Sequence, residues 1–64
     1  MKRRDLEQHL SIHKCRLLRE GSRHSVYHNI NNGQTSTVPR HTEIFSSLIR
    51  KICKDLGIPI PHKK

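Results

Sequence analysis

The 64-residue sequence has few aromatic residues, few acidic residues and no long apolar run. Tryptophan is absent, and phenylalanine and tyrosine occur once each. No uninterrupted apolar stretch is longer than two residues, as in Leu17–Leu18 and Leu48–Ile49. The sequence therefore shows neither a signal peptide nor a membrane-spanning segment. We expect a soluble, cytoplasmic protein with no membrane partner.

Cysteine is also scarce, since Cys15 and Cys53 are the only two and lie far apart. There is no Cys-X-X-Cys pair to indicate a redox centre or a zinc site. Six histidines are present, but only His9 and His13 have a spacing that could share a metal, as an isolated pair on a helix. We expect both cysteines to be free and buried, and we expect neither a metal nor another cofactor.

The charge is strongly one-sided, with 13 Lys and Arg residues against 5 Asp and Glu, a formal net charge of +8. Such an excess favours a polyanionic partner, namely nucleic acid, an anionic membrane or an acidic protein. The alternative is that the excess of positive charge only keeps the protein soluble. A chain this short buries only about 60% of the surface of its unfolded form, so a large, deep pocket is not expected. We predict one domain over residues 1–60 and a flexible basic tail over 61–64.

Apolar periodicity predicts a helix near each end of the chain. Leu6 and Leu10 give residues 2–13 a narrow apolar stripe. A broader stripe at one-residue and three-residue steps predicts the second helix, and its members are Leu48, Ile49, Ile52, Cys53 and Leu56. Ser46 or Ser47 is its expected N-cap, and Gly57 stands where a helix-ending glycine belongs. Ile44 and Phe45 are expected to anchor the preceding loop to the core.

Three short strands are predicted between the helices. They begin at Cys15, near His24 and near Gln34, and the turns between them are marked by Gly21–Ser22 and by the sequence "NNG" at 31–33. The fold class is therefore α+β: a helix, a three-stranded antiparallel sheet and a helix. Two helices on one face of such a sheet bury both stripes, which is the layout of double-stranded-RNA-binding domains.

Four segments, "RDLEQHL", "LLREGSRHSVY", "TVPRH" and "IRKICKDLGI", occur in an order that resembles the HicA family of toxins from bacterial toxin–antitoxin pairs. The resemblance implies a metal-independent endoribonuclease that cleaves mRNA, does not itself act on DNA, and is silenced by a HicB-like antitoxin. It also implies that His24 is the catalytic histidine. The family motif reads Gly-Ser-His, whereas Arg23 intervenes here, so either the turn is one residue longer or Ser22 takes the place of the glycine. A second departure is Lys14, where the family often has glycine.

Histidine suits the proton transfers of RNA cleavage because imidazole titrates near neutral pH. Arginine suits the phosphate because its planar guanidinium donates two parallel hydrogen bonds. Together with the resemblance, these arguments make His24 the candidate catalytic residue, and the candidate substrate-binding residues are Arg19, Ser22, Arg23, Arg40 and His41.

His28 lies about 13 Å from His24 at the rise of a strand, too far to share one proton with it. Tyr27 is expected to face the opposite side of the sheet. Three functions stay open on the residues alone: a ribonuclease, an RNA-binding module without catalysis, and a protein that neutralises an acidic partner. A solvated His24 on a strand fits the last two.

Overall fold

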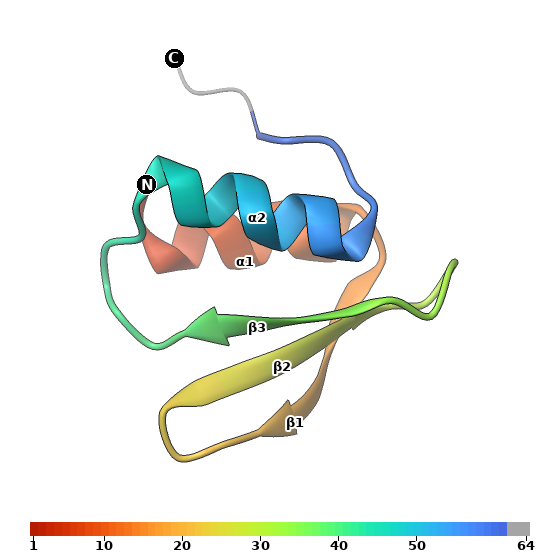
Figure 1. Ribbon diagram of the computed structural model, residues 1–64, viewed down its shortest axis with the longest axis horizontal. Helices are drawn as coiled ribbons and strands as arrows, with labels where there is room; N and C mark the ends of the chain where they lie inside the picture. Colours follow the sequence, from red (N-terminus) through yellow and green to blue (C-terminus); the bar gives the residue numbers. More distant parts are fainter. Residues whose placement is uncertain (62–64) are drawn as a thin grey trace.

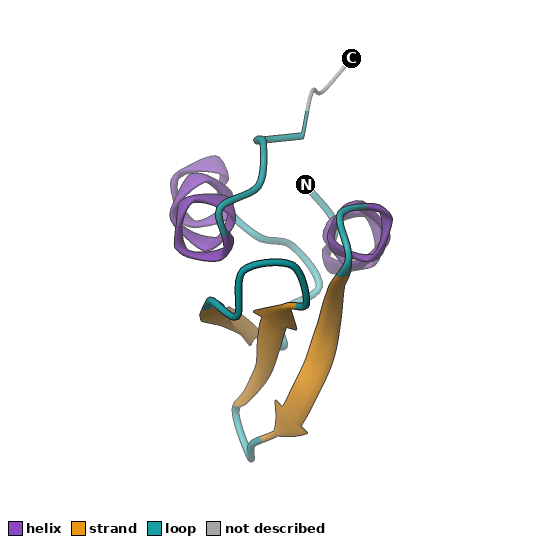
Figure 2. Ribbon diagram, turned by 90° about the vertical axis from the view of Figure 1, so that its right-hand side faces the viewer, coloured by secondary structure: helices purple, strands orange, loops and turns teal. Residues whose placement is uncertain are grey.

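The structure, a computed structural model, describes residues 1–61 (Figure 1). Its elements follow the predicted order, and their bounds are α1 Arg3–Ile12, β1 Cys15–Glu20, β2 His24–Asn29, β3 Thr35–Pro39 and α2 Ser46–Leu56. Figure 2 shows both helices on one side of the sheet and nothing from the described chain on the other. The α+β prediction is thus confirmed. Of the predicted tail, 62–64 lie outside the described residues.

The two predicted apolar stripes meet between the helices and the sheet. Leu6 and Leu10 of α1 are fully buried, and so are most members of the α2 stripe. They pack with Cys15, Val38 and Ile44 to form a single core cluster. Both cysteines are free and buried, as predicted. Burial raises the pKa of the Cys15 and Cys53 thiols, which keeps them protonated and unreactive.

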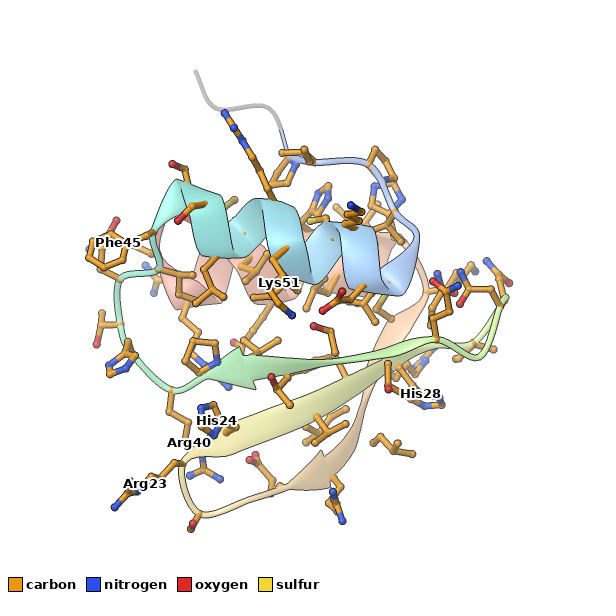
Figure 3. All side chains as sticks on the ribbon, viewed as in Figure 1. Arg23, His24, His28, Arg40, Phe45 and Lys51 are labelled. Carbon is orange, nitrogen blue, oxygen red and sulfur yellow. The ribbon has the colours of Figure 1, made fainter. Side chains whose placement is uncertain are left out.

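The ends of α2 were only partly predicted. Gly57 adopts φ 70° and ends the helix as expected. The N-cap is Phe45, which makes no side-chain cap hydrogen bond, so the expected serine cap is wrong. Ile44 is buried, but Phe45 is 80% exposed (Figure 3), so only Ile44 anchors this loop. The physical reason is that a chain turning into a helix can direct only one of two successive side chains at the core.

The sheet has the order β1–β2–β3 and is antiparallel throughout. On β2, Ser25, Tyr27 and Asn29 point towards the helices, since Tyr27 reaches Glu7 of α1 and Asn29 donates to the carbonyl oxygen of Leu56 at 2.8 Å. The alternate residues, which begin with His24, therefore face the uncovered side of the sheet. The predicted opposition of Tyr27 and His24 is confirmed.

A β-bulge interrupts β1 between Leu17 and Arg19. Before it, Leu17 lies opposite Tyr27 on the helix side. After it, Arg19 lies opposite Val26 on the uncovered side, and Glu20 lies opposite Ser25 on the helix side. Unbroken alternation from Leu17 would have placed Arg19 under the helices, because side chains two residues apart share a face. The bulge is what presents Arg19 beside the residues of β2 that face solvent.

Candidate active site

His24 is exposed and is the first residue of β2, next to the turn from β1. Gly21 closes this turn by donating its N–H to the carbonyl oxygen of His24 at 2.7 Å. A Cβ on Gly21 would lie 2.9 Å from that same oxygen, closer than side chains approach. Any other residue at this position would therefore force the backbone of the turn to shift. Ser22 and Arg23 lie between Gly21 and His24 in this turn.

A surface depression of about 430 Å³ surrounds His24. Its lining includes three of the predicted substrate-binding residues, Arg19, Ser22 and Arg23. Figure 3 shows Arg23 and His24 together at one end of the sheet. Sequence reasoning did not identify Val26 and Thr37, which also line the depression. These two lie directly opposite each other on β2 and β3, a register that no local pattern reveals.

The other two predicted residues lie outside that depression. The Nη2 atom of Arg40 donates to Oε1 of Glu20 at 2.5 Å and to the carbonyl oxygen of Gly21 at 2.7 Å. Arg40 thus lies beside the turn that carries His24 (Figure 3) and holds it in place. His41 is exposed and is not part of the lining.

A hydrogen-bond network lies beneath the turn, on the helix side of the sheet. Ser25, which is 1% exposed, donates to Glu20 at 2.8 Å and accepts from Nη2 of Arg3 at 3.0 Å. Nε of Arg3 donates to the carbonyl oxygen of Pro39 at 2.9 Å, and Pro39 lies opposite His24 in the sheet. The ends of all three strands around His24 are therefore fixed by side chains that the sequence did not single out.

His28 and Tyr27 do not line the depression around His24. His28 shares the uncovered face with His24 but lies towards the other end of β2, opposite Arg16 and Thr35 (Figure 3). Tyr27 donates to Glu7 at 3.3 Å. Burial, followed by the nearby Glu7 carboxylate, raises the pKa of the Tyr27 phenol, which keeps it protonated.

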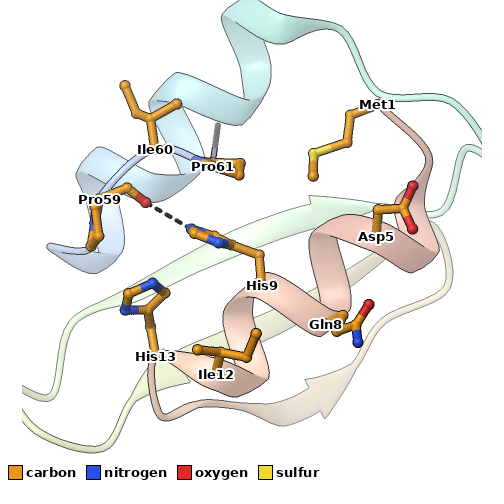
Figure 4. Close-up of a pocket in the computed structure, with 9 residues that line it drawn as sticks. All are labelled: Met1, Asp5, Gln8, His9, Ile12, His13, Pro59, Ile60 and Pro61. Atoms are coloured by element: carbon orange, nitrogen blue, oxygen red, sulfur yellow. Dashed lines mark hydrogen bonds between the residues drawn. The ribbon is translucent and has the colours of Figure 1, made fainter. Parts of the chain in front are cut away.

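His9, on α1, and His13, just beyond the end of this helix, lie beside the C-terminal segment with ring centroids 4.6 Å apart (Figure 4). Nε2 of His9 lies 2.7 Å from the carbonyl oxygen of Pro59, an acceptor only, so this nitrogen carries a hydrogen and donates it. It is therefore not available as a metal ligand in this arrangement. Within residues 1–61, no group of three or more histidine, cysteine or acidic side chains could hold a metal ion. No helix of that same range is long and apolar enough to cross a membrane.

Comparison with known protein families matches the chain to the family described as "HicA toxin of bacterial toxin-antitoxin". The match covers residues 3–58, from the start of α1 to just beyond the end of α2. Comparisons with curated proteins and with solved structures gave no match. The matched range contains every side chain around the turn that carries His24.

Proposed function

The chain belongs to the HicA family, the toxins of bacterial toxin–antitoxin pairs, and its family implies a HicB-type antitoxin partner. On this premise we propose that it is a metal-independent endoribonuclease of the cytoplasm that cleaves mRNA, with His24 as its one catalytic histidine. The observation that carries the proposal is the placement of an exposed histidine in the same surface depression as Arg19, Arg23 and Ser22.

This set of side chains matches the needs of RNA cleavage by transesterification. The 2′-oxygen loses its proton and bonds to the adjacent phosphorus, while the bond from phosphorus to the 5′-oxygen breaks and that oxygen gains a proton. His24 supplies proton transfer to this reaction, which a well-placed group accelerates by about 10²–10⁴-fold. Arg19 and Arg23 bind the phosphate and offset the negative charge that builds up on its oxygens. Ser22 donates a hydrogen bond to the same group.

The test compares two histidine variants on one strand. His24→Ala should lower the rate of cleavage of a labelled RNA by at least about 10²-fold, whereas His28→Ala should cut at close to the parent rate. His28 is a matched control because it lies on the same face of β2, four residues along. If His24→Ala cuts as fast as the parent, His24 is not the catalyst. If the parent protein binds RNA without cutting it, the chain is an RNA-binding module instead.

The same assay tests the proposed chemistry. EDTA should not reduce cleavage, since every proposed step uses side chains alone. DNA of matching sequence should survive because it lacks the 2′-hydroxyl. Loss of activity in EDTA that is restored by Mg²⁺ would contradict the mechanism, and so would cleavage of the DNA.

A further inference from the structure

A second depression, of about 400 Å³, adjoins the turn that carries His24 on the helix side of the sheet. It is formed by the start of α1 and the loop between β3 and α2, which are tied together by a hydrogen bond from the backbone N–H of Arg3 to the carbonyl oxygen of Thr42 at 2.8 Å. Its lining consists of four cations, one carboxylate and one hydroxyl-bearing residue: Lys2, Arg3, Arg4, Arg40, Glu7 and Thr42.

The cations in this depression differ in how they are held. Each of the three nitrogens of the Arg3 guanidinium donates a hydrogen bond, to Pro39, Glu7 and Ser25. Arg40 is fixed by its hydrogen bonds to the β1–β2 turn. Both guanidinium groups are therefore in place before any ligand arrives, which lowers the entropy lost on binding. The charge of Arg40 is offset by its ion pair with Glu20. The carboxylate of Glu7 is offset by its ion pair with Arg3.

Lys2 and Arg4, by contrast, are exposed, and within residues 1–61 neither side chain makes a hydrogen bond or an ion pair. Their donors are available to a ligand. No aromatic side chain lines the depression, whereas the hot spots of protein–protein interfaces are enriched in Trp and Tyr as well as Arg. The surface therefore fits a small, hydrated anion better than an acidic protein.

We infer that this depression binds a further phosphate of the RNA strand that is cleaved at His24, with Lys2 and Arg4 as its direct ligands. Arg40 links the two sites, because it lines this depression and also bonds to Glu20 and Gly21, which line the depression around His24. The RNA strand would pass around the end of the sheet, from its uncovered face to the start of α1. This inference rests on the proposed function.

The experiment measures RNA binding separately from cleavage, in a His24→Ala background. The variant is Lys2→Gln/Arg4→Gln, and the control is Arg50→Gln/Lys54→Gln, which removes the same charges from exposed positions on α2. The probe is a set of short, labelled single-stranded RNAs of different sequence, titrated over a range of salt concentrations. The variant should bind all of them about tenfold more weakly, and its plot of log affinity against log salt should be shallower by about 0.7, because it neutralises one phosphate fewer. The control should keep the parent slope.

Equal reductions in affinity for variant and control would show an effect of overall charge and overturn the inference. It is also overturned if His24→Ala binds no RNA, or if the variant binds RNA like the parent but has a lower affinity for a polyglutamate peptide, which would assign the surface to an acidic protein. Cleavage that survives in His24→Ala would contradict only the proposed role of His24. The inference about Lys2 and Arg4 would stand, because it is tested by RNA affinity and not by the rate of cleavage.

Discussion

Gly21→Ala tests whether the β1–β2 turn positions His24. The added Cβ would lie 2.9 Å from the carbonyl oxygen of His24, and ordinary contact begins at 3.4 Å. The two atoms must therefore move apart by about 0.5 Å. Because the oxygen belongs to the backbone and the Cβ is bonded directly to it, the backbone itself must shift. Misplacement of a catalytic group by about 1 Å costs on the order of 10²-fold in rate. A displacement of half that size predicts a cleavage rate about tenfold lower, which corresponds to an activation free energy about 1.4 kcal/mol higher.

The same steric conflict should lower the free energy of unfolding by about 1–3 kcal/mol. The total free energy of unfolding of a domain of this size is only about 3–10 kcal/mol. Cleavage must therefore be measured well below the melting temperature of the variant, which circular dichroism determines.

Gly33→Ala is the control for this experiment. Gly33 has φ +74° but nothing within 4 Å of an added Cβ, and it lies in the other hairpin turn. Left-handed backbone costs an alanine about 1–2 kcal/mol, so this variant should lose similar stability and keep the parent cleavage rate. If folded Gly21→Ala cuts RNA as fast as the parent, or if both variants slow equally, the turn does not position the catalytic group.

Three further predictions concern stability and the partner. Ile52→Ala removes a side chain that is 1% exposed; the free energy of unfolding should fall by about 2–5 kcal/mol, and a melting temperature within a degree or two of the parent would show that α2 packs differently. Hydrogen bonds from Lys51 and Ser36 lower the pKa of Asp55, so ionised Asp55 stabilises the fold above its unfolded pKa of about 3.9, and this stabilisation disappears as the pH falls through the lower folded pKa. Asp55→Asn should therefore be less stable near neutrality and lose less stability on acidification below about pH 4; parallel pH profiles would refute this. Finally, the cognate antitoxin should displace labelled RNA from His24→Ala, more weakly at high salt; a ternary complex with unchanged RNA affinity would mean separate surfaces.

Local sequence patterns were sufficient to predict the two helices and the order of the helices and strands along the chain. The stripe that includes Ile49 and Ile52 had to be buried, because a helix this short is stable in water only when its apolar face packs on something. Gly57 ended α2 as predicted. The residue that follows a helix often has a left-handed backbone conformation, and glycine is the residue most often found there. His24 was singled out from the family motif, and its neighbours in sequence, Ser22 and Arg23, are also its neighbours in the depression.

The composition of the candidate site depended on tertiary structure. The bulge in β1 brings Arg19 to the uncovered face, and it arises from pairing with β2, which no property of β1 alone encodes. Arg40 was predicted from its charge, but the structure uses it to clamp the turn through Glu20 and Gly21, residues 20 and 19 positions away in sequence. Arg3 was not predicted at all, because its role depends on Ser25 and Pro39, which only the packing of α1 on the sheet brings within hydrogen-bonding distance. A sequence pattern records which face of its own element a residue occupies, whereas these hydrogen bonds join elements that are distant along the chain.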